Sequence, residues 1–224
     1  MIPTVGPWTG VAYPVTMAPD QSASAAGRLI GEAAHITAGL DREEIGKAAD
    51  LLFATWQAGS YVLSCGNGGS ASTASHFSAD VAKLTIVPGR QRVKSLCLND
   101  NVSALTAWTN DNGFASVFAE QAAPWFDRHA TLVAFSVHGG SPDRSVSSNV
   151  ADVCALARDK GAAVIGVTGF DGGLLASTAT VHLNVPVRIE PVATPLIESL
   201  HLLIQHALCL ALRERITGSR QERR

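Results

Sequence analysis

The spacing of hydrophobic positions changes at about Gly59. Before it, an alanine-rich segment covers residues 21–38, and Asp41 with Glu44 three positions later forms a capping-box pattern for a second helix ending at Gly59. After it, short apolar runs alternate with helix-length stretches. The runs cover residues 61–65, 93–98, 131–137, 162–168 and 180–185. The pattern predicts two helices followed by alternating strands and helices.

The five runs are nearly continuous in apolar residues, which is typical of strands buried on both faces. Helix-length connections between them indicate a parallel sheet built from right-handed crossovers. We therefore predict an α/β fold, a three-layer sandwich with a five-stranded parallel sheet flanked by helices and preceded by two N-terminal helices. Residues 194–216 are apolar on nearly every side and predict a buried final helix.

Length and composition favour one domain, because 224 residues with 46% hydrophobic content can build one sizeable core. We expect residues 1–20 to form an extended, proline-rich arm, residues 21–217 the domain with its N-terminal oligomerisation helices, and residues 218–224 a polar tail. The four cysteines show no C-x-x-C spacing and are expected to be reduced and buried.

Charge and hydropathy limit the partners and the location of the chain. A formal net charge of −2 offers no basic excess to attract nucleic acid. The first twenty residues do not resemble a signal peptide, and no uninterrupted apolar stretch approaches the roughly 18 to 20 residues of a membrane span. We expect a cytoplasmic protein outside the membrane.

A glycine-rich loop follows the first strand and opens a helix, at residues 65–77. Gly66, Gly68 and Gly69 permit close backbone approach, and the free N–H groups of the helix start, with the Ser70 hydroxyl, suit an anion. The loop lacks the Gly-Lys-Ser ending of a nucleotide P-loop and the G-x-G-x-x-G spacing. A tight turn that binds nothing is the alternative.

A second polar loop, at residues 136–145, stands in the same position after the third strand. Ser136, His138 and Ser141 carry groups that can donate to phosphate oxygens. In the alternative interpretation, Ser141 is an N-cap followed by Pro142 at the first helical position. Two such loops at the carboxyl edge of a parallel sheet indicate a phosphorylated ligand.

Ionisable residues gather on two of the predicted helices. His76 and Asp80 share one helix face at i and i+4, which suits a metal or acid–base chemistry. Glu198, His201 and His206 interrupt the apolar last helix, where each needs a partner because an unpaired buried polar group is costly. A core histidine bonded to a carbonyl is the alternative for each imidazole.

These segments, together with TNDNGF at 109–114 and ESLHLLIQH at 198–206, resemble the phosphoheptose isomerase branch of the sugar-isomerase (SIS) family over roughly residues 25–216. The resemblance implies the SIS fold, a homotetramer with active sites at subunit interfaces, and a zinc ion or another divalent metal in each subunit. It implies conversion of sedoheptulose 7-phosphate into D-glycero-D-heptose 7-phosphate through an enediol.

Site residues follow from the same resemblance. Phosphate and sugar contacts fall to Asn67, Gly68, Gly69, Ser70, Asn110, Asp111, Ser136, His138 and Ser141; catalytic roles to His206, Asp80, Asp111 and Glu198; and metal ligation to His76, Asp80, Glu198 and His206. Asp80 replaces the glutamate of the family, Glu198 its glutamine, and His138 a small hydroxyl residue.

Helix geometry complicates the metal set, because residues eight apart on a straight helix are separated by about 12 Å along its axis. Glu198 and His206 therefore cannot easily share one ion, and His201 is a rival to His206. The alternative function is a non-catalytic SIS protein, either a sugar-phosphate-binding regulator or a scaffold resembling replication-initiator-associating proteins.

Overall fold

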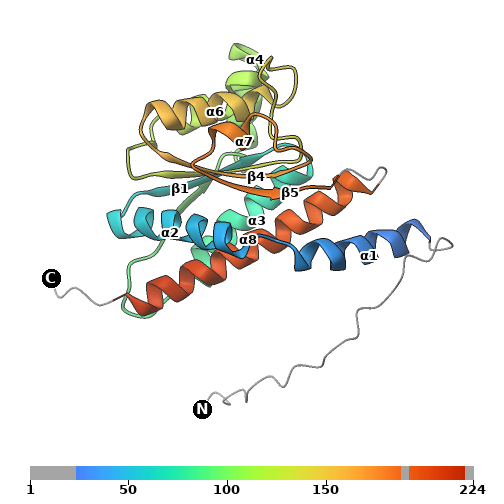
Figure 1. The fold of residues 1–224 in the computed structure, drawn as a ribbon. Coiled ribbons are helices and arrows are strands. Elements are labelled where there is room, and N and C mark those ends of the chain that lie inside the picture. The colour runs from blue at the N-terminus through green and yellow to red at the C-terminus, as the bar shows by residue number, and fades with distance from the viewer. Residues whose placement is uncertain (1–23, 188–191, 220–224) are drawn as a thin grey trace.

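A computed structural model describes residues 24–187 and 192–219. The described residues form a three-layer α/β sandwich around one five-stranded parallel sheet of order β2-β1-β3-β4-β5, which confirms the predicted fold class (Figure 1). The strands are β1 (Tyr61–Gly66), β2 (Lys94–Cys97), β3 (Thr131–Ser136), β4 (Ala163–Gly169) and β5 (Val181–Val185). The described helices are α1 (Ala25–Ala38), α2 (Arg42–Ala58), α3 (Gly69–Leu84), α4 (Val102–Asn112), η1 (Phe114–Ser116), α5 (Val117–Ala122), α6 (Ser148–Asp159), α7 (Leu175–Thr178) and α8 (Ala193–Gly218).

Each face of the sheet carries its own apolar core. Residues of α2, α3 and α8 pack on one face, and residues of α5 and α6 pack on the other. Figure 1 shows α2, α3 and α8 below the sheet and α4, α6 and α7 above it. Every residue of β3 is buried, as expected for a central strand covered on both sides. Because all strands are parallel, their carboxyl ends meet at one edge.

The predicted N-terminal helices are confirmed where the structure describes them. The Asp41 carboxylate accepts hydrogen bonds from the backbone N–H groups of Glu43 (2.9 Å) and Glu44 (3.0 Å), so it caps α2. Gly59 ends α2 in the left-handed conformation, with φ of 66°, which glycine adopts at low cost. α1 has no buried residue, although its inner side packs against the α8 core.

The last helix, α8, is the predicted buried helix, and it contacts α3, α2 and α1 (Figure 1). Alone among the described helices, it is long and apolar enough to cross a membrane by length and composition. This is weak evidence for a span, because half of the relevant window is buried inside the protein, as in the core helix of a soluble protein.

The helix after the second polar loop begins later than predicted. Residues 141–147 form turns, and α6 begins at Ser148, so the interpretation of Ser141 as a helix N-cap is wrong. Ser147 takes the N-cap position with φ of 50° and no side-chain cap. The predicted arm, residues 1–20, lies outside the described residues, while Gly218 still belongs to α8. All four cysteines are free and buried, as predicted.

Candidate functional site

The glycine loop joins β1 to α3 at the carboxyl edge of the sheet. Gly68 has φ of 56° and precedes α3 without providing a side-chain cap. The N–H groups of Ala71 and Ser72 donate to loop carbonyls, so within the described residues those of Gly69 and Ser70 are left for another acceptor. Ser70 is buried in that first turn. A helix start of this kind attracts anions through its dipole and its free donors, which fits the predicted phosphate site.

The second polar loop, residues 136–145, is the serine loop, and it is organised around a carboxylate. The hydroxyl groups of Ser141 (2.6 Å) and Ser145 (2.8 Å) donate to Asp143, and the Ser145 N–H adds a third bond of 3.1 Å. These hydrogen bonds, that of Ser141 foremost, lower the pKa of Asp143 to about 2. The Ser141 oxygen also accepts from the Val146 N–H at 3.0 Å. Ser141 therefore shapes the loop, and a phosphate would compete with Asp143 for its hydroxyl proton.

His138 lies exposed in the same loop and stacks on Phe170, with ring centroids 4.8 Å apart and planes at 8°. Phe170 follows β4 and has φ of 50°, which is uncommon for an aromatic residue. Ser136, at the end of β3, accepts a hydrogen bond from the Gly139 N–H at 3.1 Å. Both side chains thus stand at the carboxyl edge of the sheet, as predicted.

The serine loop and the loop after β4 touch through their backbones. Gly139 and Gly173 both have positive φ, and a side-chain carbon at Gly139 would overlap the carbonyl of Gly172. The N–H of Leu174 donates to the Gly140 carbonyl at 3.0 Å, which joins the two loops. Only residues without a side chain fit at this contact.

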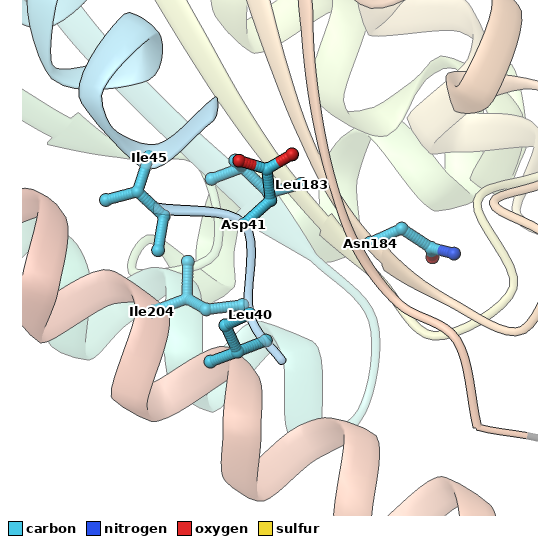
Figure 2. A pocket seen from close by; sticks show the side chains of 6 residues that line it. All are labelled: Leu40, Asp41, Ile45, Leu183, Asn184 and Ile204. Carbon is cyan, nitrogen blue, oxygen red and sulfur yellow. The ribbon is translucent and has the colours of Figure 1, made fainter. Parts of the chain in front are cut away.

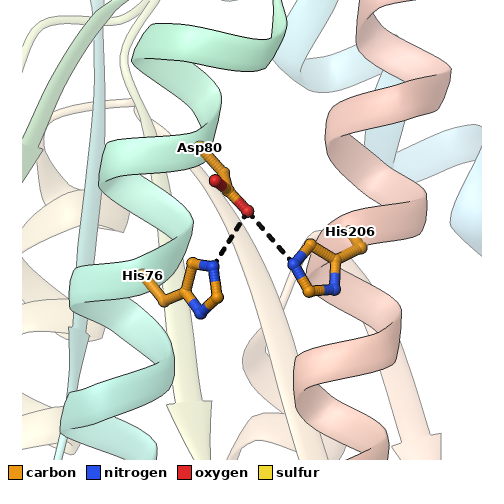
Figure 3. Close-up of side chains that lie close together, drawn as sticks. All are labelled: His76, Asp80 and His206. Carbon is orange, nitrogen blue, oxygen red and sulfur yellow. Dashed lines mark ion pairs between the residues drawn. The ribbon is translucent and has the colours of Figure 1, made fainter.

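Three predicted residues form a compact polar cluster on two neighbouring helices (Figure 3). His76 and Asp80 come from α3, one turn apart, and His206 reaches them from α8. The Nε2 atoms of both imidazoles lie 3.2 Å from Oδ2 of Asp80, and the two rings meet edge to face with centroids 5.1 Å apart. One ligand atom from each residue lies within 4.8 Å of the others.

The cluster is open to a ligand on one side and supported on the other. The His76 and His206 side chains are 46% and 39% exposed, whereas Asp80 is 17% exposed. Gln205, which is fully buried, donates from its side chain to the same Asp80 oxygen at 3.3 Å. Asp80 is therefore held in place from behind while both imidazoles face accessible space.

Glu198 and His201 lie elsewhere on α8. A side chain at Gly69 would overlap the Glu198 carboxylate, so this carboxylate lies against the start of α3 and outside the cluster. His201 is fully buried, and its ring is tilted against that of Phe135 at a centroid distance of 6.3 Å. The structure thus places His206, and neither Glu198 nor His201, beside Asp80.

Burial sets the chemistry of His201. Desolvation lowers its pKa to about 4, and the nearby Thr168 backbone opposes this shift only in part. Neither ring nitrogen reaches a hydrogen-bond partner within the described residues. His201 is consequently neutral at pH 7. The Thr168 backbone is the carbonyl that the alternative interpretation assigned to a core histidine, although it does not reach hydrogen-bond geometry with either ring nitrogen.

Asn110 and Asp111 lie at the exposed end of α4, on the sheet face opposite to α8 (Figure 1). The Asn110 side chain donates to the Asp111 carboxylate at 2.7 Å. Within one chain, these two residues do not join the cluster of His76, Asp80 and His206.

A small hollow opens between the α1–α2 junction, β5 and α8 (Figure 2). It offers about 10 Å³, which is room for about one water and far too little for a sugar phosphate. Its lining residues are Leu40, Asp41, Ile45, Leu183, Asn184 and Ile204, none of which belongs to the predicted site.

Two asparagines that the sequence analysis did not single out touch the glycine loop. Asn99 hydrogen-bonds the backbone of Gly66, and Asn149 hydrogen-bonds the side chain of Asn67. The run Asn99-Asp100-Asn101 begins two residues after the end of β2, which is the position where ligands and their supports gather in parallel sheets. Its position after a strand could therefore have identified Asn99 as a candidate site residue from the sequence.

Comparisons with known proteins agree with this geometry. The family model described as "SIS domain" matches residues 32–169. Lincomycin biosynthesis protein LmbN of Streptomyces lincolnensis is 62% identical over 82% of this chain and 66% of its own length. The phosphoheptose isomerase of Rhodospirillum rubrum is 36% identical over 74% of this chain and 82% of its own length.

The fold is also shared with a solved relative. The structure of phosphoheptose isomerase GmhA from Neisseria gonorrhoeae has a TM-score of 0.69 and 32% identity, covering 84% of this chain and 92% of its own. The parallel sandwich with a glycine loop and a serine loop is the SIS fold. The chain belongs to the SIS family, in its phosphoheptose isomerase branch.

Proposed function

We propose that the chain is a sugar-phosphate isomerase that interconverts an aldose and a ketose, with sedoheptulose 7-phosphate to D-glycero-D-heptose 7-phosphate as the first candidate reaction. One observation carries the proposal: α3 begins at the glycine loop and carries His76 and Asp80 on the same helix. Seven helical residues from Gly69 to His76 span about 10 Å, which suits a chain of about seven carbons with a terminal phosphate.

The cluster fits a divalent metal. Two imidazole nitrogens and one carboxylate oxygen are the donors that catalytic zinc sites use, with a further position left open for substrate. His76, Asp80 and His206 would hold the ion, without the fourth predicted ligand, Glu198. A bound divalent cation supplies a positive charge that polarises the substrate's carbonyl and the adjacent hydroxyl.

Proton transfer falls to Asp111 of a neighbouring subunit in this arrangement, because the Glu198 carboxylate lies against Gly69 at the phosphate end of the site and is not a member of the cluster. Asp111 takes the proton from the carbon beside the carbonyl, which gives an enediolate. A proton then passes from the adjacent hydroxyl to the former carbonyl oxygen, and Asp111 returns its proton to the neighbouring carbon. Without a metal, Asp80 and His206 are the candidate acid–base pair.

The relative named for lincomycin biosynthesis favours a second substrate candidate. Its 62% identity exceeds the 36% of the phosphoheptose isomerase, so a different phosphorylated ketose of similar length is an alternative to sedoheptulose 7-phosphate. The non-catalytic alternative, a sensing or scaffold protein, predicts no tightly bound metal. The accessible His76, Asp80 and His206 favour the enzyme, because such a cluster has no evident role in a scaffold.

We also propose a cytoplasmic homotetramer with shared active sites. Exposed apolar side chains on α1 and on the outer side of α8 support this: Ile30 on α1 is 70% exposed, and Leu203 and Leu210 on α8 are 42% and 56% exposed. A neighbouring subunit would also explain how Asn110 and Asp111 contribute to a site from the exposed end of α4. Sedimentation showing a monomer would contradict this arrangement.

The test combines metal analysis with turnover. Purified protein is analysed for zinc and other divalent metals and assayed with sedoheptulose 7-phosphate, before and after chelation. We expect about one metal ion per chain, turnover that chelation removes, and recovery on adding the metal back. Metal-free protein without turnover would contradict the enzyme and favour the sensing or scaffold alternative.

His206→Ala tests the cluster, with His35→Ala as its matched control. His35 is an exposed imidazole on α1, so its loss removes a histidine without touching the cluster. We expect His206→Ala to lose metal and turnover while keeping the wild-type unfolding temperature within about 3 °C. Full activity and full metal content in His206→Ala would refute the assignment.

A further inference from the structure

One side of the glycine loop is held by Asn99. Its side-chain oxygen accepts from the Gly66 N–H at 3.1 Å, and its side-chain nitrogen donates to the Gly66 carbonyl at 2.9 Å. The parallel register of β1 and β2 pairs Ser64 with Cys97. Two positions further along lie Gly66, the last residue of β1, and Asn99, beyond the end of β2. The Asn99 amide thus replaces the missing strand neighbour of Gly66.

The other side of the loop is held by Asn149, the second residue of α6. Asn67 donates to the Asn149 oxygen at 2.9 Å, and Asn149 donates back to the Asn67 oxygen at 2.8 Å. Asn149 is fully buried, whereas Asn67 lies at the edge of the loop. A two-way amide pair fixes both side-chain planes, because each amide supplies a donor and an acceptor.

The backbone at residues 66 and 67, between the two amides, is closely packed. A side-chain carbon at Gly66 would overlap the Ser70 carbonyl in the first turn of α3 and crowd the Phe135 carbonyl of β3. Residues 66 and 67 are therefore fixed from β2, from β3 and from α6 at once. The N–H groups at the start of α3 inherit this fixed geometry, because α3 follows two residues later.

We infer that Asn99 and Asn149 are positioning residues that hold the glycine loop in its phosphate-binding shape before the substrate arrives. The inference rests on the proposed function. Each residue touches the loop and acts on the phosphate through it. A loop ordered in advance loses less conformational freedom on binding, so its two amide clamps raise phosphate affinity without adding a contact to the phosphate.

Asn99→Leu and Asn149→Leu remove the clamps while keeping a side chain branched at the same carbon, and Thr55→Val is the matched control. Thr55 and Thr131 share a buried hydrogen bond of 2.7 Å at the opposite, amino end of the sheet. Each protein is assayed for sedoheptulose 7-phosphate turnover, inorganic phosphate binding by titration calorimetry, and thermal unfolding. Asn149→Ala, which removes the same bonds without adding bulk, replaces Asn149→Leu if the latter does not fold.

We expect each clamp variant to raise KM and the phosphate Kd about tenfold, with kcat within about threefold of wild type. The double variant should have a KM and a phosphate Kd only slightly higher than those of the single variant with the lower affinity. A loop released on one side gains little from the remaining clamp. Thr55→Val should lose stability with KM unchanged. Amide hydrogen exchange at residues 66–72 should quicken in the clamp variants alone.

The outcomes separate the two proposals. Suppose that the wild-type protein binds phosphate and turns over substrate, but the clamp variants keep its KM. That result overturns the positioning roles and leaves the proposed function standing. An equal rise of KM in Thr55→Val also overturns them, because general loosening would then explain the effect. Wild-type protein that neither binds phosphate nor turns over overturns the proposed function and this inference with it.

Discussion

Acid sensitivity of the fold is expected to depend on one buried imidazole, His201. The folded protein holds its pKa at about 4, whereas an unfolded histidine titrates near 6.5. The depressed pKa means that the folded state favours the neutral ring. Stability is therefore complete above the unfolded pKa and is lost as the pH falls from about 6.5 to about 4.

The magnitude follows from the difference between the two pKa values. At about 1.4 kcal/mol per pKa unit, the neutral ring accounts for about 3 kcal/mol of stability that disappears across this range. This is a large share of the roughly 5–15 kcal/mol that stabilises a typical domain. The His201 ring is fully buried, so solvent screening does not reduce the effect.

His201→Leu removes the titrating group and keeps the volume. Urea unfolding at pH 7.5 and at pH 4.5 should show that the variant loses about 2–3 kcal/mol less than wild type between the two conditions. At pH 7.5 the variant should be more stable by about 1 kcal/mol, because two unsatisfied ring nitrogens leave the core.

The control is His35→Gln, an exposed histidine on α1 that should leave the pH dependence of stability unchanged. Identical pH dependence in His201→Leu and wild type would refute the reasoning. An NMR titration of folded wild-type protein in which the His201 ring protonates near pH 6.5 would do the same.

Two further predictions concern the site. Glu198→Gln removes a carboxylate beside the start of α3, so inorganic phosphate should bind about three- to tenfold more tightly in titration calorimetry. Weaker phosphate binding would contradict this placement of the charge. Asp143→Ala frees the Ser141 hydroxyl and removes the organiser of the serine loop. KM should therefore rise several-fold in steady-state kinetics, whereas an unchanged KM would separate the Asp143 network from substrate binding.

Much of the fold could be predicted because the responsible forces are local in the sequence. The strands appear as nearly continuous apolar runs because both faces of the sheet are covered, while the edge strands β2 and β5 also carry polar residues. The Asp41 cap and the terminal Gly59 were recognisable by residue type alone. Likewise, the pairing of His76 with Asp80 follows from the spacing of one helical turn.

The remaining features depend on contacts between distant segments. Whether His201 or His206 meets Asp80 is decided by the rotation of α8 against α3, which no spacing within α8 reveals. Ser141 resembled a helix cap because serine supports caps and loop turns through the same hydrogen bonds. The clamp by Asn149 joins positions 82 residues apart, so it became visible only in three dimensions.

The glycine contact between the serine loop and the loop after β4 bears on how the substrate range of such an enzyme can evolve. Gly139 meets the Gly172 backbone where no side chain fits, so a single substitution there would push two ligand-facing loops apart at once. Substitutions are therefore expected to accumulate away from this glycine contact, at positions such as His138 and Phe170, whose rings stack on each other in the same two loops. Libraries aimed at new phosphosugars should keep the glycines fixed and vary this aromatic pair jointly.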